Sequence, residues 1–112
     1  MSIHRLAEMT WEEVRDARSD GSVAILPVGA VEAHGPHLPL GTDVVIAEAM
    51  ARSCAEKLGE REVVAFVLPP LWYTAAGFAD NFPGTICVDE RTVSKLIRQI
   101  ATSLKGQGIT TL

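Results

Sequence analysis

The chain has 112 residues, a length that fits one domain with one modest hydrophobic core. Its 47% hydrophobic and 21% charged residues exclude wholesale disorder, and its net charge of -4 provides no basic field that would capture nucleic acid. Because no run is apolar enough for a membrane-spanning helix or a secretion signal, we expect a cytoplasmic protein that binds neither nucleic acid nor membrane.

The first predicted elements are a short helix and a buried strand. The segment Thr10-Trp11-Glu12-Glu13 has the pattern of a capping box, which predicts a helix over 11–18. The run 23–30 is continuously apolar, which is typical of a strand buried on both faces. Proline lacks the backbone N–H that a sheet uses, so we place Pro27 near the end of this strand.

A second helix and a second strand are predicted next. Apolar residues recur at helical spacing over 44–58, and Gly59 stands where a C-terminal cap belongs. The apolar run 63–68 predicts another buried strand, which Pro69-Pro70 closes because neither proline can donate to a ladder. We expect a long loop over 71–88.

The last predicted helix begins after Asp89, which is a favourable N-cap residue. Gly106 or Gly108 would end this helix, and 109–112 has the composition of the start of a third strand. The helix carries one apolar face, formed by Val93, Leu96, Ile97, Ile100, Ala101 and Leu104.

Strands that alternate with amphipathic helices predict an α/β fold with a mainly parallel sheet flanked by helices. Two strands and the start of a third make a poor sheet, because parallel sheets need several strands and cover on both faces. We therefore expect the chain to be the front part of a larger domain, or to be completed by a second chain.

The segment 32–43 gathers possible metal ligands in a loop rich in proline and glycine. In an extended chain Glu32 and His34 point to the same side, just beyond a strand end, and a compact loop can bring Asp43 to the same point. Mixed oxygen and nitrogen ligands suit Zn, Mn or Fe. Other interpretations remain open: Asp43 or Thr42 as a helix N-cap, and Glu32 with His34 as a surface hydrogen bond.

The run from Leu26 to Asp43, LPVGAVEAHGPHLPLGTD, resembles the N-terminal motif of the creatininase family of metal-dependent amidohydrolases. Pro69-Pro70 and the later block Phe82-Pro83-Gly84-Thr85-Ile86 resemble a second motif of that family. The resemblance implies a three-layer creatininase-like fold, in which 1–112 is the N-terminal part of a single domain that stops after the start of the third strand.

The resemblance also implies a site with two divalent metal ions, Zn and/or Mn, with Fe possible. Glu32 and His34 would each bind one metal ion and Asp43 would bridge both. The implied reaction is hydrolysis of a non-peptide or cyclic amide C–N bond in a small molecule, with metal-bound hydroxide as the nucleophile. Members of the family are commonly hexameric homo-oligomers.

Members of the family carry a further His and Glu after the third strand, so this chain would hold only the first half of the site. Many of them also have a His shortly before the second motif, where this chain has the segment 78–81, FADN. We therefore expect a different substrate pocket, lined by Trp72, Tyr73 and Phe78. His37 is expected to be a second-shell or substrate-side group, because neighbouring prolines constrain its backbone.

Two further hypotheses stay open at this point. The chain alone is either part of an enzyme or a non-catalytic fragment or assembly subunit that lacks the remaining ligands. The site is either dinuclear or a mononuclear one built from Glu32, His34, His37 and Asp43.

Overall fold

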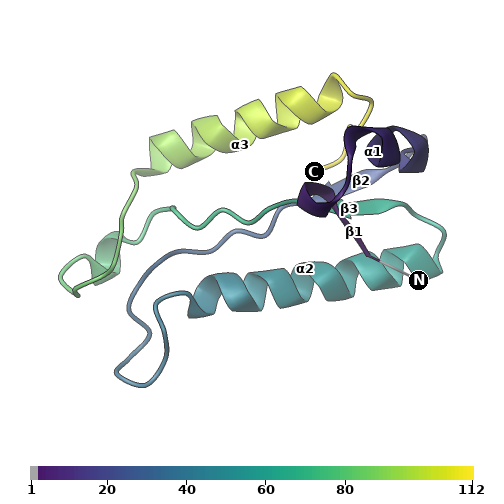
Figure 1. Ribbon diagram of the computed structural model, residues 1–112. Helices are drawn as coiled ribbons and strands as arrows, with labels where there is room; N and C mark the ends of the chain where they lie inside the picture. Colours follow the sequence, from purple (N-terminus) through teal and green to yellow (C-terminus); the bar gives the residue numbers. More distant parts are fainter. Residues whose placement is uncertain (1–2) are drawn as a thin grey trace.

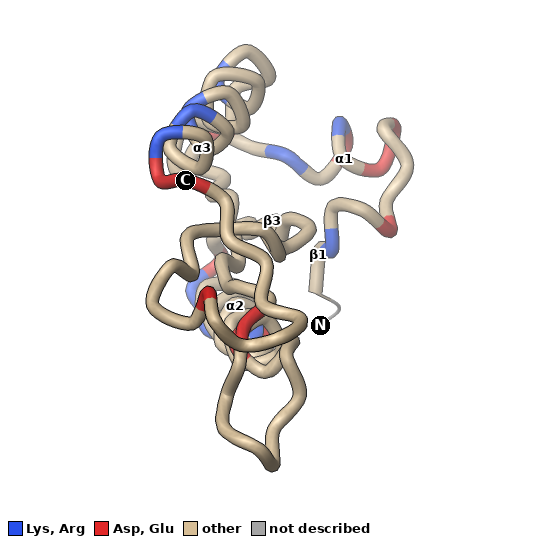
Figure 2. The backbone as a smooth tube through the Cα atoms, turned by 90° about the vertical axis from the view of Figure 1, so that its left-hand side faces the viewer, with Lys and Arg blue, Asp and Glu red and all other residues tan. Residues whose placement is uncertain are grey.

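The computed structural model describes residues 3–112 as a three-layer α/β arrangement (Figure 1). A parallel sheet with the strand order β1-β3-β2 forms the middle layer, and helices α2 and α3 lie on opposite sides of it (Figure 2). The predicted α/β class is confirmed. The elements in chain order are β1 (His4–Arg5), the 3-10 helix η1 (Leu6–Glu8), α1 (Trp11–Ala17), β2 (Val23–Ile25), α2 (Thr42–Glu60), β3 (Ala65–Val67), the 3-10 helix η2 (Gly77–Ala79) and α3 (Glu90–Lys105).

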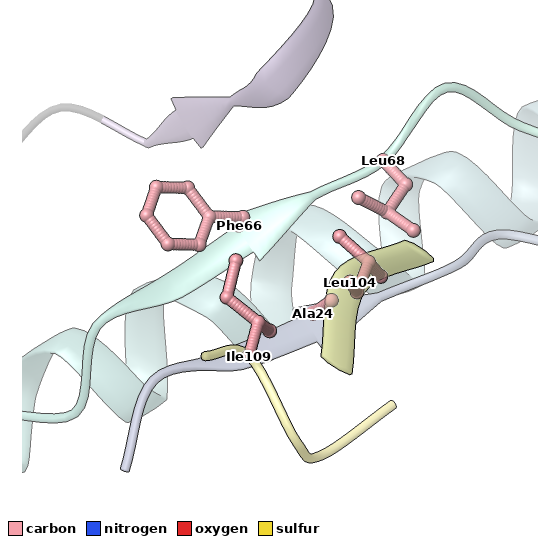
Figure 3. Packing of buried hydrophobic residues seen from close by; sticks show 5 residues of the cluster. All are labelled: Ala24, Phe66, Leu68, Leu104 and Ile109. Atoms are coloured by element: carbon pink, nitrogen blue, oxygen red, sulfur yellow. The ribbon is translucent and has the colours of Figure 1, made fainter. Parts of the chain in front are cut away.

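The core lies on the two faces of β3, as predicted for a strand without an exposed face. Successive side chains of a strand point to opposite faces, so Phe66 and Ala65 enter different clusters. On the α3 side, Phe66 is fully buried in the cluster that Figure 3 shows. That cluster consists of Ala24, Phe66, Leu68, Leu104 and Ile109, and the one on the α2 side consists of Ala51, Ala55, Ala65 and Val67.

The predicted strand over 23–30 was too long, because β2 ends at Ile25. Prolines interrupt both neighbouring strands at this level, Pro27 on one and Pro69-Pro70 on the other, and proline cannot donate to a ladder. The segments that follow β2 and β3 nevertheless continue side by side. Leu71 N–H donates to the Pro27 carbonyl at 2.9 Å, and Gly29 N–H donates to the Leu71 carbonyl at 3.0 Å.

The helix predictions held better in the middle of each helix than at its ends. Thr10 caps α1 with both hydrogen bonds of a capping box, as predicted. Neither Thr42 nor Asp43 caps α2, because both lie inside the helix and Gly41 is the N-cap. Gly59 is not its C-terminal cap either. The helix continues to Glu60, and the chain turns at Glu62, which has a φ of 63°.

Asp89 caps α3 as predicted, and the helix ends at Lys105. Its apolar face is only partly covered, since Leu104 is 7% exposed whereas Leu96 is 40% exposed. The predicted third strand consists of one bridge, in which the Thr111 carbonyl accepts Ala24 N–H at 2.9 Å. Strand β1 was not predicted, because two residues are too few to show a periodic pattern.

Among residues 3–112, no helix has the length and apolar character required to cross a membrane.

Candidate metal centre

The segment between β2 and α2 continues beyond the carboxyl end of the sheet (Figure 1). Glu32 and His34 belong to this segment. Backbone hydrogen bonds hold both edges of this segment. Glu32 N–H donates to the Leu40 carbonyl at 3.1 Å on one edge, and the Val31 carbonyl accepts Ile86 N–H at 2.9 Å on the other. The backbone is therefore fixed in the extended form that directs side chains two residues apart to one side.

The two side chains converge as predicted, but they do not hydrogen bond to each other. Glu32 Oε1 and His34 Nε2 are 3.4 Å apart, and Glu32 is only 7% exposed. Glu32 Oε2 and His34 Nε2 are both buried without a hydrogen-bond partner. The alternative of a surface hydrogen bond between these residues is therefore wrong.

Asp43 reaches the same place from the first turn of α2. Its Oδ2 accepts Ala30 N–H at 3.0 Å, which fixes the carboxylate beside the segment that leads from β2 to Glu32. This approach requires Gly29, because a Cβ atom there would lie 2.7 Å from Val44 Cγ2 and 2.8 Å from the Val44 nitrogen. The start of α2 thus packs directly on the backbone that leads to Glu32.

One ligand atom from each of Glu32, His34 and Asp43 lies within 4.8 Å of the other two. A metal ion fits this group, because it would satisfy the two buried polar atoms that lack partners, and each such atom otherwise costs about 1–3 kcal/mol. Two carboxylates and an imidazole suit Zn or Mn. Three side chains cannot fill the coordination shells of two metal ions, so positions would remain for other ligands.

The structure does not bring His37 into this group. His37 is exposed in the turn that the bridge between His34 and Leu38 closes, and its ring lies near Gly35. The four-ligand mononuclear site is therefore not assembled among the described residues.

Of the three aromatic residues predicted to line the pocket, Trp72 lies beside the start of α2, a part of the chain close in sequence to Asp43. A Cβ atom on Gly41, the N-cap of α2, would lie 3.1 Å from Trp72 Cζ3. Tyr73 and Phe78 are 57% and 83% exposed. Their predicted role as pocket residues is not tested by this arrangement.

Two threonines that were not predicted as site residues hydrogen bond to the backbone that carries the ligands. Thr85 Oγ1 accepts Ala33 N–H at 3.1 Å, and the buried Thr74 hydroxyl donates to the Gly29 carbonyl at 2.6 Å. Both threonines lie far along the chain from the segment they contact, so no spacing rule could pair them. Thr85 belongs to the second motif of the resemblance, which was the one signal that pointed to it.

Comparison with known proteins identifies the family. The profile of the family described as creatinine amidohydrolase matches residues 7–112. The chain belongs to the creatininase family. The resemblance inferred from the segments 26–43 and 82–86 is therefore confirmed.

Two relatives illustrate the range of activities within the creatininase family. The mycofactocin precursor peptide peptidase of Mycolicibacterium smegmatis is 38% identical over 92 residues, which are 80% of this chain and 36% of the relative. The creatinine amidohydrolase of Pseudomonas putida is 33% identical over 109 residues, 92% of this chain and 40% of the relative. The chain thus spans well under half the length of these hydrolases.

Solved creatininase structures share the fold. A manganese creatininase matches with a TM-score of 0.87 and 31% identity, over 99% of this chain and 44% of that chain. A mutant creatininase of the Zn-Zn type matches with a TM-score of 0.84 and 31% identity, over 96% of this chain and 42% of that chain. The three-layer creatininase-like fold is therefore confirmed, and both metals predicted for the site occur in structural neighbours.

Proposed function

We propose that the protein carrying this chain is a metal-dependent amidohydrolase that cleaves a non-peptide or cyclic amide C–N bond. The observation that carries this proposal is the convergence of Glu32, His34 and Asp43, with two buried polar atoms left without partners. Membership of a family of hydrolases supports it. A buried carboxylate without a cation is costly, so a stable fold with this group favours a cation beside it.

In this proposal Glu32 and His34 would each hold one divalent metal ion, Zn and/or Mn, and Asp43 would be a ligand of both. Asp43 would suit this shared position because its carboxylate has several lone pairs and accepts one hydrogen bond from residues 3–112, that of Ala30 N–H. When bound, the metals supply Lewis-acid polarisation of the amide carbonyl and a water of lowered pKa. The protein fixes the ligand geometry by holding the Glu32 to His34 backbone extended.

The substrate is proposed only as a class, a small-molecule amide. One relative is named for creatinine and the other for a precursor peptide, so the common element is a C–N bond at a carbonyl group. We assign Trp72, Tyr73 and Phe78 to the substrate side of the site, and His37 to a place beside the ligands, without a bond of its own to a metal ion. We also propose, from the family resemblance, a cytoplasmic homo-oligomer, a hexamer in the family pattern.

The test is metal stoichiometry in the full-length protein. Elemental analysis after loading with Zn²⁺ or Mn²⁺ should find two ions per chain in the wild type. His34→Ala should lose metal, and the matched variant His37→Ala should keep both ions. A wild-type protein that retains no metal would overturn the proposal. One ion per chain, lost in His37→Ala, would instead support the mononuclear site.

A second candidate function is a non-catalytic subunit, and one observation favours it. Residues 3–112 assemble three metal ligands in this group, fewer than two enclosed metal ions need. Under this alternative the isolated 112-residue chain binds metal weakly and exchangeably and hydrolyses no amide. Steady amide turnover by the isolated chain would exclude it.

A further inference from the structure

The turn 82–85 packs against the loop that carries the metal ligands. Thr85 N–H donates to the Phe82 carbonyl at 3.2 Å, and Gly84 has a φ of 89°, a conformation that suits glycine. A Cβ atom on Gly84 would collide with Leu40 Cδ1. The turn therefore has both the conformation and the close contact that place Thr85 beside the ligand segment.

Thr85 contacts the peptide that joins the two ligands. Its Oγ1 accepts Ala33 N–H at 3.1 Å, and Ala33 lies between Glu32 and His34. The next residue, Ile86, donates its N–H to the Val31 carbonyl at 2.9 Å. In an extended chain Val31 C=O and Ala33 N–H face the same edge, so this pair of bonds resembles one step of a sheet ladder.

Thr85 Oγ1 thus accepts the hydrogen bond that a backbone carbonyl of a neighbouring strand would accept in a sheet. Without it, Ala33 N–H would lose its partner in a partly buried position, and the peptide would lose the restraint that sets its orientation on this edge. Rotation there changes the direction of His34 relative to Glu32, because both side chains depend on the extended form of this segment. On the opposite edge, the Glu32 N–H bond to the Leu40 carbonyl and the bridge between His34 and Leu38 hold the two flanking residues, but neither uses Ala33 N–H.

We propose that Thr85 is a positioning residue of the metal centre, whose hydroxyl fixes the peptide between Glu32 and His34 so that both side chains reach the metal ions. This inference rests on the proposed function. It differs from a role in turn stability alone, because a residue that only stabilised the turn would change unfolding and leave metal affinity unaltered.

The experiment compares Thr85→Val with Thr85→Ser in the full-length protein. Valine keeps the volume but cannot accept a hydrogen bond, whereas serine keeps the hydroxyl. In a Mn²⁺ titration we expect Thr85→Val to bind roughly 10- to 100-fold more weakly, the range usual for groups that orient metal ligands. Thr85→Ser should bind close to the wild type. In the metal-free protein, the Ala33 amide should exchange its hydrogen faster in Thr85→Val.

The matched control is Thr92→Val, because the Thr92 hydroxyl also makes a hydrogen bond, to Asp89 at 3.0 Å, but at the start of α3. It should leave the Mn²⁺ affinity unchanged. Equal affinities of wild type and Thr85→Val would overturn the positioning role while leaving the proposed function intact. A folded Thr85→Ser that binds as weakly as Thr85→Val would also overturn it. A wild type that binds no Mn²⁺ would overturn both proposals.

Discussion

The centre of the sheet and its carboxyl end differ in whether buried side chains find suitable partners among the described residues. At the centre, Phe66 is 0% exposed and packs with residues of β2 and α3. At the carboxyl end, Glu32 is almost as well buried, yet its Oε2 has no partner. Burial therefore stabilises the fold in the first region and carries an energetic cost in the second, where open α/β sheets bind their ligands.

The largest effect is expected from Phe66→Ala, because it removes the largest fully buried side chain of the central region. Such a change lowers the free energy of unfolding by about 3–5 kcal/mol. Urea denaturation of the metal-free protein measures it. The control Phe78→Ala removes a side chain that is 83% exposed and should change the free energy of unfolding by about 0.5 kcal/mol or less. Equal losses would contradict the assignment of the core.

A smaller loss is expected from Gly29→Ala, at the border between the two regions. The added methyl group would lie 2.8 Å from the Val44 backbone nitrogen, so α2 must shift away from the backbone around Gly29. We expect a loss of about 1–3 kcal/mol in the free energy of unfolding, the usual cost of overpacking. The Mn²⁺ affinity should also fall, because Asp43 moves with α2.

The control for this prediction is Gly77→Ala, since a methyl group at Gly77 meets no atom within 4 Å. It should affect neither thermal unfolding nor the Mn²⁺ titration. A Gly29→Ala protein that unfolds like the wild type would show that Gly29 and the start of α2 do not pack as closely as the structure indicates.

The central region was largely predictable from the sequence. The apolar runs predicted β2 and β3, and the capping residues Thr10 and Asp89 predicted where α1 and α3 begin. These signals are local, because capping and periodicity depend on residues within a few positions of one another. Helix and strand ends were predicted less well. The end of β2 depends on Pro27 and on the prolines of the neighbouring strand together.

The carboxyl end was predictable only in part, and for a physical reason. Glu32 and His34 are two residues apart, so the extended chain alone brings them together. The approach of Asp43 depends on how closely α2 packs against Gly29, which no local pattern records. Asp43 was also a plausible cap, and the structure uses its carboxylate on Ala30 N–H instead. The contact from Thr85 crosses from one loop to another.

Glu32→Gln is expected to raise the free energy of unfolding rather than lower it. It tests whether the burial of the Glu32 carboxylate at the carboxyl end of the sheet opposes stability. The glutamine amide is uncharged and can donate a hydrogen bond to His34 Nε2, so the variant removes a buried carboxylate and gives an unpaired nitrogen a partner. In the metal-free protein we expect the free energy of unfolding to rise by about 1 kcal/mol. The Mn²⁺ affinity should fall, because a carboxylate ligand is lost.

The control for Glu32→Gln is Glu60→Gln, at an exposed position at the end of α2. Glu60→Gln should change neither the free energy of unfolding nor the Mn²⁺ affinity. A metal-free Glu32→Gln protein that is clearly less stable than the wild type would contradict the idea that this carboxylate is retained for binding.

The smallest effect concerns Asp89, which caps α3 on the side of the ligand loops. Thr92 N–H donates to Asp89 Oδ1 at 2.9 Å, and this bond and that of the Thr92 hydroxyl lower the pKa of Asp89 below its ordinary value of 3.8. A carboxyl group whose pKa is lower in the folded state stabilises that state at pH values above its pKa in the unfolded chain. That contribution is lost as the pH falls below 3.8 and through the lowered pKa.

Asp89→Asn separates the cap from its charge, because asparagine caps a helix about as well but does not titrate. Near neutral pH the variant should unfold at a slightly lower temperature than the wild type, because the stabilising contribution of the Asp89 charge is complete there and the variant lacks it. Below pH 3.8 the wild type should lose stability more steeply than the variant, since only the wild type takes up a proton at this position. Thermal unfolding between pH 2.5 and 7 measures the difference. Parallel curves would mean that the charge of Asp89 contributes nothing to the stability of α3 beyond the hydrogen bonds of the cap.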